Sequence, residues 1–421
     1  WPIRYKDIAP WYSYVEKFIG VSGSTENLPQ LPDSEFLPPM ELNVVEKTVA
    51  QRIKEHYKDT RRLIIGRVAH VTKAIKDRTP CQYRNMCWNG CQFGGYFSTQ
   101  ASTLPAAVKT GNLTLRPHSI VKEVKYDKST KKATGVTIID AETNEEMTFN
   151  SKIVFLCASA FNSTWILMNS AKDVWEGGLG SSSGELGHNA MDHHFRLGAS
   201  GEFEGHEDSY YYGHRPNGFY IPRYRNVDPN EKRDYIRGFG YQGSASRNGR
   251  ERQVAERNIG KDLKDSLGEP GKWSIGATAF GEMLPYHENK ISLDPEKKDK
   301  WGLPVLNMDV EIKENEKKMK IDMMADMKEM LEKAGATNVS TYEAEYAPGM
   351  GIHEMGTARM GRDPKSSVLN GNNQVWDCLN VFVTDGACMT SASCVNPSLT
   401  YMALTARAAN FAAEELKKGN L

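Results

Sequence analysis

The chain has 421 residues, of which 39% are hydrophobic, so it is long enough for two or more domains with ordinary buried cores. Lysine plus arginine equals aspartate plus glutamate, with 53 residues in each class, so the composition does not indicate nucleic acid or an acidic membrane surface as a partner. No run approaches the roughly eighteen apolar residues that span a bilayer, so we expect a soluble protein. Residues 1–10 lack a signal-peptide core, but this leaves the compartment, periplasmic or cytoplasmic, unknown.

The first part of the chain changes from helices to strands. Residues 1–60 predict helices, the second of them over 41–57 after a proline-rich connection at 29–39. Beyond them, apolar and polar residues alternate over 114–126, which indicates half-buried antiparallel strands. The apolar run KIVFLCASA at 152–160 then leads into the helix-like FNSTWILMNSA. Such a step from strand through turn to helix is typical of a doubly wound sheet.

The second part is dominated by strands. A glycine- and serine-rich loop at 177–187 precedes a long strand-rich region that ends at about Leu306. One strong helix is predicted over 313–334, with a methionine stripe that indicates core packing and Gly335 at its end. Five aromatic residues of the strand-rich region suit either a sheet core, which we favour, or stacking on a sugar ring: Tyr210, Tyr211, Tyr212, Phe219 and Tyr220.

Two further patterns invite functional interpretations that their surroundings do not support. A literal G-x-G-x-x-G occurs at Gly238, Gly240 and Gly243, but a polar, loop-like stretch follows it instead of an apolar helix. We therefore predict a tight β-turn or bulge there. His193 and His194 do not predict a metal site, because adjacent residues on a strand point to opposite faces.

The C-terminal part carries three motifs in order: HEMGTARMG at 353–361, the strand-like LNVFVTDGA at 379–387, and a helix-like segment at 393–419. Asn396 suits a helix cap, and Pro397 suits a first helical turn. A helix that begins in this way presents free backbone N–H groups and the positive end of its dipole. Both stabilise negative charge on a bound ring or phosphate.

These motifs resemble the C-terminal part of the glucose–methanol–choline family of flavin oxidoreductases, closest in pattern to the catalytic subunits of bacterial FAD-dependent sugar and alcohol dehydrogenases. The resemblance implies FAD as the cofactor, His353 as a catalytic residue and Asn396 as the second active-site residue. Segments around 112–124 and 152–161 also resemble the family's flavin domain. The implied cofactor-binding residues are Val121, Ala158, Ser159, Asp385, Gly386, Asn396 and Pro397.

The resemblance also implies a mixed α/β (α+β) fold, in which a doubly wound flavin-binding domain is interleaved with a substrate domain on a large antiparallel sheet. We expect residues 61–187 and 347–421 to form the FAD-binding domain, and residues 1–60 and 188–346 the substrate-binding domain. The family's dinucleotide fingerprint precedes the segment that the N-terminus resembles. We therefore expect an upstream N-terminal segment with a βαβ unit to complete the FAD site.

The implied reaction is the oxidation of an alcohol or sugar hydroxyl to a carbonyl by hydride transfer to flavin. A neutral imidazole suits removal of the hydroxyl proton, and an amide can donate a hydrogen bond to the oxygen without adding charge. We assign His353 as the base and Asn396 as the oxygen partner. Two alternatives stay open: a cofactor-less binding or assembly subunit that keeps the fold, and an oxygen-using oxidase of the same family.

Cys81, Cys87 and Cys91 form a C-x5-C-x3-C cluster that is short enough to bring three thiolates together. The cluster resembles a region that carries a three-iron cluster in bacterial sugar dehydrogenases of the family, except that Gln82 replaces a further cysteine. One interpretation is an iron–sulfur cluster that passes electrons to an accepting protein subunit. The other is a packed loop, with or without a disulfide.

Overall fold

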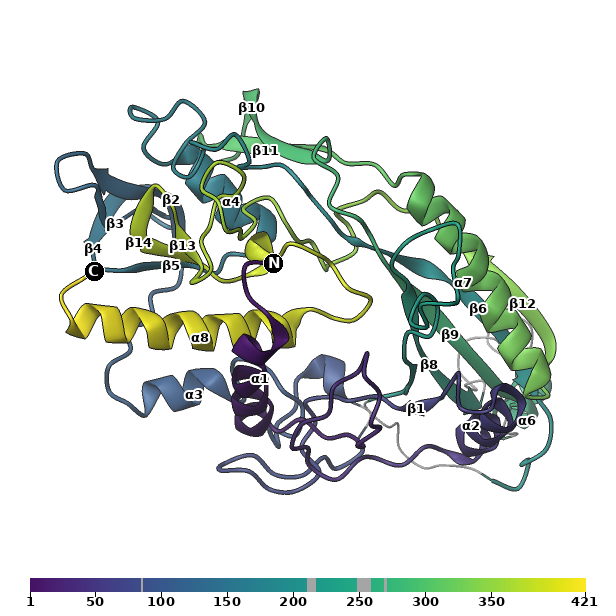
Figure 1. Ribbon diagram of the computed structural model, residues 1–421. Helices are drawn as coiled ribbons and strands as arrows, with labels where there is room; N and C mark the ends of the chain where they lie inside the picture. The colour runs from purple at the N-terminus through teal and green to yellow at the C-terminus, as the bar shows by residue number, and fades with distance from the viewer. Residues whose placement is uncertain (85, 210–216, 248–258, 269–270) are drawn as a thin grey trace.

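The computed structural model describes residues 1–84, 86–209, 217–247, 259–268 and 271–421 (Figure 1). The helices are α1 Tyr5–Ile19, α2 Val44–Tyr57, α3 Thr103–Val108, α4 Ala160–Asn169, α6 Gly260–Gly268, α7 Glu314–Lys333 and α8 Ser398–Lys417, with 3-10 turns at Cys87–Asn89 and Gly386–Cys388. The strands are β1 Ile64–Ile65, β2 Ser119–Asp127, β3 Lys132–Asp140, β4 Glu146–Asn150, β5 Val154–Leu156, β6 His193–Phe203, β7 Phe219–Ile221, β8 Phe239–Arg247, β9 Trp273–Glu282, β10 Lys290–Lys298, β11 Pro304–Asp309, β12 Thr337–Glu343, β13 Gln374–Val375 and β14 Cys378–Val383. The fold is mixed α/β, as predicted. Within the described residues, no helix has the length and apolar character that a membrane crossing requires.

The larger sheet is antiparallel and has six strands in the order β1-β7-β8-β9-β6-β12. Helix α7 lies along this sheet at one end of the molecule (Figure 1), and its methionine stripe faces the sheet and α2. The stripe is fully buried at Met319, Met323, Met327 and Met330. The predicted helix over 313–334 and its role in the core are confirmed, because an apolar stripe at helical spacing is stable only when it is covered.

The smaller sheet has the order β13-β14-β5, and β14 and β5 run parallel. Its two faces are covered by different helices. Phe382 and Phe155 stack on each other at 4.7 Å, and Phe382 joins a small apolar core with Ala408 and Ala412 of α8. Val381 and Val383 point the other way, into the core that contains α4. This helix, sheet, helix layering is the doubly wound arrangement that the strand, turn and helix step at 152–160 predicts.

The glycine-rich pattern at 238–243 is not a turn or bulge, so that prediction was wrong. Gly240 and Gly243 lie in β8, which pairs with β9 without any register shift. A Cβ atom on Gly243 would lie 2.3 Å from the carbonyl oxygen of Gly276 and 2.5 Å from the ring of Phe219. The glycine is needed because a neighbouring strand and an aromatic ring approach the backbone closely.

The two N-terminal helices belong to different parts of the molecule. Helix α1 packs on α8, and Trp1 Nε1 donates to Ser391 Oγ at 2.8 Å. Helix α2 instead packs with α7 on the larger sheet (Figure 1). Residues 1–60 therefore contact both halves of the fold, and the division into FAD-binding and substrate-binding domains stays a prediction.

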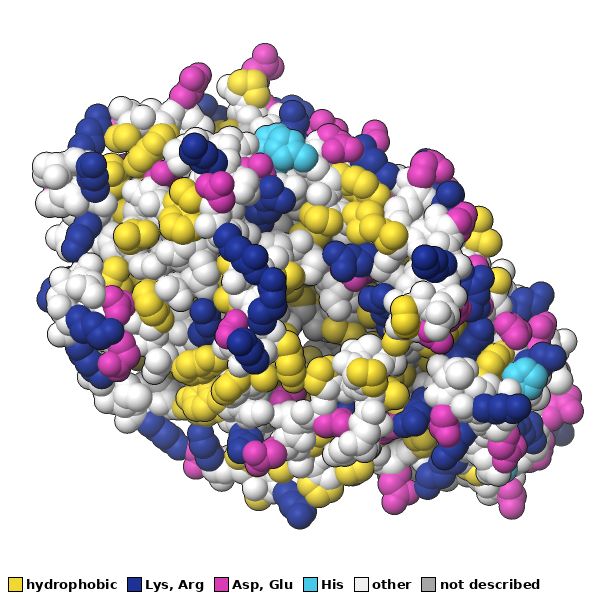
Figure 2. All heavy atoms as spheres, viewed as in Figure 1, with side chains coloured by type: hydrophobic (Ala, Val, Ile, Leu, Met, Phe, Trp, Pro, Cys, Tyr) yellow, Lys and Arg dark blue, Asp and Glu magenta, His cyan; other side chains and the backbone are white. Residues whose placement is uncertain are grey.

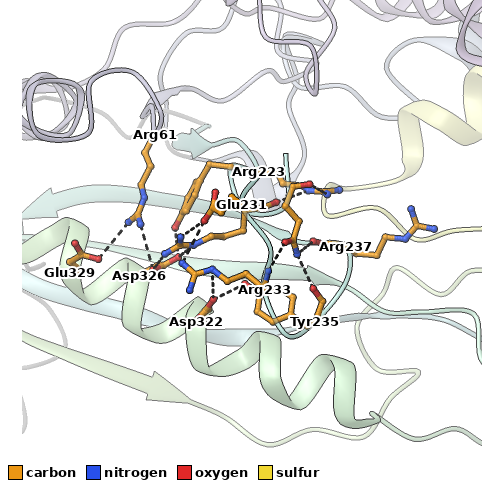
Figure 3. A network of polar contacts seen from close by, with 12 residues as sticks. Arg61, Arg223, Glu231, Arg233, Tyr235, Arg237, Asp322, Asp326 and Glu329 are labelled. Carbon is orange, nitrogen blue, oxygen red and sulfur yellow. Dashed lines mark hydrogen bonds and ion pairs between the residues drawn. The ribbon is translucent and has the colours of Figure 1, made fainter. Parts of the chain in front are cut away.

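A network of charged side chains fixes the connection between β7 and β8 on α7 (Figure 3). Asp326 of α7 is buried and accepts hydrogen bonds from Arg225 at 2.6 and 2.7 Å and from Tyr224 at 2.9 Å. Tyr235 donates to Asp322, one turn earlier, at 2.8 Å. The network therefore attaches the connection between β7 and β8 to α7.

Candidate active site

Four polar side chains meet where the larger sheet approaches the start of α8. His353 Nε2 lies 3.1 Å from Asn396 Nδ2, and His353 Nδ1 lies 2.8 Å from His193 Nδ1. Gln242 of β8 donates to Asn396 Oδ1 at 2.5 Å. The structure therefore brings together the two residues proposed as catalytic, and adds two partners from the sheet.

The loop that carries His353 is held by Asp192, which immediately precedes β6. The Asp192 carboxylate accepts hydrogen bonds from the backbone N–H groups of Gly349 at 3.0 Å and Gly351 at 2.7 Å. A Cβ atom on Gly351 would lie 2.2 Å from this carboxylate, so the contact requires glycine. Burial raises the pKa of Asp192 to about 6, against the opposing effect of its backbone hydrogen bonds. Asp192 and His193 thus fix the loop and the ring of His353 from consecutive positions.

The histidines of the site are buried, and this lowers their pKa. Burial lowers the pKa of His353, whose exposed fraction is 8%. Burial is also the larger cause at His193, where the positive charge that His353 would carry adds to it and the pKa falls to about 4. Phe280 lies against both rings, 6.0 Å from His193 and 6.1 Å from His353. Burial therefore favours the neutral form of both imidazoles, which is the form that can accept a proton.

Four of the predicted cofactor-binding residues meet at the carboxyl edge of the smaller sheet. Asp385 follows β14, and its carboxylate accepts from Ala387 N at 3.0 Å and from Ser163 Oγ at 2.5 Å. Ala158 and Ser159 follow β5 and are exposed, and Ala158 N donates to Ser163 Oγ at 2.9 Å. Burial raises the pKa of Asp385.

Gly386 completes this edge. A Cβ atom at Gly386 would lie 2.3 Å from the carbonyl oxygen of Glu354, so the HEMGTARMG segment packs directly on it. Val121 of β2 packs against the apolar core that contains Leu156 and Ala160. An exposed carboxyl edge of parallel strands, next to helix starts, is where doubly wound folds bind nucleotide cofactors. The residues present therefore fit FAD.

The predicted helix cap at Asn396 was wrong. Helix α8 begins at Ser398 with Pro397 in the N-cap position, and no side chain caps it. The Asn396 side chain turns instead toward His353 and Gln242. The first backbone N–H groups of α8 thus keep the ability to stabilise negative charge.

A cavity of about 1200 Å³ lies beside these residues, between α1, β8 and the start of α8. Asn396, Gln242 and Tyr220 are among its lining residues. Figure 2 shows a hollow near the middle of the face that Figure 1 presents. Tyr220 and Phe219 both line the cavity, although Phe219 is almost fully buried, and Tyr210–Tyr212 lie outside the described residues. Asn396 connects the cavity to His353.

The cysteine cluster forms no ligand set in the structure. Cys81, Cys87 and Cys91 are free thiols in the structure. In the part of the chain that the structure describes, no three His, Cys, Asp or Glu side chains converge as a metal site requires. The iron–sulfur hypothesis thus has no geometric support.

The fold is mixed α/β, and it places a His and Asn pair next to an uncapped helix start. These features are expected of the flavin oxidoreductases that the C-terminal motifs resemble. Comparison with known proteins identifies the family. The chain belongs to the GMC oxidoreductases, whose N-terminal and C-terminal family models match residues 2–195 and 285–405.

Three bacterial relatives illustrate the similarity. The chain is 29% identical over 431 residues to 2-methyl-1,2-propanediol dehydrogenase of Mycolicibacterium austroafricanum, covering 98% of this chain and 74% of that protein. It is 24% identical over 355 residues to the fructose dehydrogenase large subunit of Gluconobacter japonicus, covering 83% and 63%. It is also 24% identical over 359 residues to the gluconate 2-dehydrogenase flavoprotein of Pantoea cypripedii, covering 77% and 55%. The chain thus spans less than two thirds of the last two.

The sequence does not indicate the contacts of His193, Gln242 and Asp192. The strand pattern argues only against a metal at His193, and the contact of His193 with His353 joins residues 160 positions apart. Gln242 lies inside the rejected glycine pattern. The one usable signal was the alternation of a strand, which directs His193 and His194 to opposite faces.

Proposed function

We propose that the chain is the catalytic part of an FAD-dependent dehydrogenase that oxidises a hydroxyl group of a small alcohol or sugar to a carbonyl. The observation that carries the proposal is the pair formed by His353 Nε2 and Asn396 Nδ2 at 3.1 Å, with Asn396 lining a cavity. The three relatives support the substrate class, because they are named for a diol, fructose and gluconate.

His353 is the proposed base. Its buried, neutral imidazole accepts the hydroxyl proton at Nε2. Asn396 Nδ2 donates a hydrogen bond to the substrate oxygen and holds it near Nε2, and Gln242 keeps the amide in this orientation by donating to Asn396 Oδ1. When bound, FAD supplies the acceptor for the hydride that leaves the carbinol carbon.

The proposed FAD contacts lie at the carboxyl edge of β5 and β14 and at the start of α8. Ala158, Ser159, Asp385 and Gly386 form that edge, and Asn396 and Pro397 precede the uncapped helix. Val121 contributes from β2 through the shared core. The N–H groups of α8 are suited to stabilise negative charge on a bound ring.

An electron-accepting protein subunit is part of the proposal, since one relative is named as a large subunit and thus implies a smaller one. The oxygen-using oxidase stays as the alternative within the family. Production of hydrogen peroxide during turnover would identify an oxidase, whereas turnover with an artificial dye under anaerobic conditions, without peroxide in air, would identify a dehydrogenase.

The test is absorbance spectroscopy of the protein supplied with FAD. A flavin spectrum that is bleached by a diol or sugar without oxygen supports the proposal. His353→Ala should keep the flavin spectrum and lower turnover by about 10²- to 10⁴-fold. His56→Ala is the matched control, because His56 is exposed on α2, away from the cavity. A protein that binds no flavin even together with the upstream segment expected from its sequence, or full turnover in His353→Ala, would refute the proposal and favour the binding or assembly subunit.

A further inference from the structure

The role of His193 goes beyond the assignment of a base. We propose that His193 is a positioning residue that fixes His353 as the tautomer with its proton on Nδ1, so that the Nε2 lone pair faces Asn396. The catalytic consequence of this arrangement rests on the proposed function, but the tautomer itself can be observed without any reaction.

The direction of each hydrogen bond follows from one backbone carbonyl. His193 Nε2 lies 2.9 Å from the carbonyl oxygen of Ser393, and a carbonyl can only accept. His193 therefore carries its proton on Nε2, and a neutral imidazole then has only a lone pair on Nδ1. His353 Nδ1, at 2.8 Å, must donate to that lone pair. The other nitrogen of a neutral His353, Nε2, is left as the acceptor.

The hydrogen bonds of Gln242 and Asn396, at the other end of this series, require the same tautomer of His353. Gln242 Nε2 donates to Asn396 Oδ1, so the Asn396 amide presents its N–H group to His353 Nε2 at 3.1 Å. Along the series from Gln242 to Ser393, each donor thus faces an acceptor. Reversing the tautomer of His353 would place two N–H groups against each other at Asn396 and two lone pairs against each other at His193.

The series requires His193 to stay neutral, and its surroundings ensure this. The side chain is 1% exposed, and burial followed by the positive charge that His353 would carry lowers its pKa to about 4. A cationic His193 would have a proton on Nδ1 and could not accept from His353. Burial at the end of the sheet therefore has a direct effect on which nitrogen of His353 is basic.

The carbonyl that starts the series is itself held in place. Ser393 has a φ of 62°, in the left-handed region that is costly for a residue other than glycine. Burial raises the pKa of Glu282, and the nearby backbone N–H of Ser393 opposes this effect; Glu282 lies directly opposite His193 in the pairing of β6 with β9. The Arg237 side chain approaches Glu282 to 3.6 Å. Ser393 thus lies beside both neighbouring strands, at His193 of β6 and Glu282 of β9.

The test compares His193→Leu, which removes the acceptor, with His193→Asn, whose Oδ1 replaces Nδ1 as an acceptor. The readout is nitrogen NMR of protein labelled with ¹⁵N-histidine, with the His353 signals assigned by their loss in His353→Gln. In the parent protein we expect a protonated Nδ1 and an unprotonated Nε2 on His353. His193→Leu should produce the opposite tautomer or a mixture, and His193→Asn should retain the parent pattern.

A parent His353 protonated on Nε2 overturns the proposal even if no variant folds. So does a His353 that keeps its Nδ1 proton completely in His193→Leu. Where the parent turns over, kcat should fall by about 10- to 100-fold in His193→Leu with little change in KM. It should recover to within about a few-fold in His193→Asn. A parent without turnover but with the expected tautomer would refute the proposed function alone.

Discussion

Acid should destabilise the folded protein through His194, whose side chain is fully buried next to β9. Neither ring nitrogen has a hydrogen-bond partner among the described residues, and a Cβ atom on Gly281 would lie 2.1 Å from Nε2. Burial, followed by the charges of His193 and Lys320, lowers the pKa of His194 from its ordinary 6.5 to about 3. The folded state therefore excludes a proton that the unfolded state takes up below pH 6.5.

The magnitude follows from this difference in proton uptake. Because the folded-state pKa is depressed, the contribution is constant above pH 6.5 and is lost as the pH falls toward about 3. Each pH unit in that window costs about 1.4 kcal/mol, so lowering the pH from 8 to 5 removes about 2 kcal/mol through His194 alone. His70 and His193, whose pKa values burial also lowers to about 4, add to the loss in the parent protein.

The assay is urea unfolding of the parent protein and of His194→Leu at pH 8 and pH 5. The variant should lose about 2 kcal/mol less than the parent between the two pH values, because His70 and His193 remain in both proteins. Met327→Ala serves as a control, since its fully buried side chain carries no titrating group and its cost should be equal at both pH values. An equal loss in the parent and in His194→Leu would refute the reasoning.

Two further predictions concern stability. Gly243→Ala should lower the free energy of unfolding by about 1–3 kcal/mol or more, because its Cβ would lie 2.3 Å from a backbone carbonyl oxygen of the neighbouring strand. Gly371→Ala, whose nearest neighbour would be 3.7 Å away, should be nearly neutral, and equal urea midpoints for the two variants would contradict this account. Asp326→Asn should cost about 3–5 kcal/mol, since it leaves the guanidinium of Arg225 without its buried carboxylate. Glu329 is half-exposed and lies 3.7 Å from Arg61. Glu329→Gln should therefore cost about 1 kcal/mol or less in the same unfolding assay.

Local signals predicted much of the fold. The helix over 313–334 has its apolar residues at helical spacing, and the continuous apolar run at 152–160 led correctly to a buried parallel strand and a helix. These patterns depend on neighbours along the chain, so the sequence contains them directly. The order of the C-terminal motifs likewise indicated the family without knowledge of the fold.

The failures came from contacts between distant segments. Glycines in a strand usually indicate a turn or bulge, but Gly243 is required by the close approach of β9 and of Phe219. Asn396 has a strong local preference for a cap, and this lost to hydrogen bonds with His353 and Gln242, which are 43 and 154 positions away. A local structural preference is overridden where tertiary contacts stabilise the fold more than the local structure would.

The packing of α1 on α8 has a consequence for how the protein is made. Tyr12 and Thr400 share a hydrogen bond at 2.6 Å although they are 388 positions apart, and Trp1 and Ser391 are 390 positions apart. Contacts of such separation form late, because a long loop must close before they stabilise anything. During synthesis α1 leaves the ribosome long before α8, so the face of α1 that packs on α8 stays uncovered until then. We therefore expect the nascent chain to be prone to aggregation at its first helix.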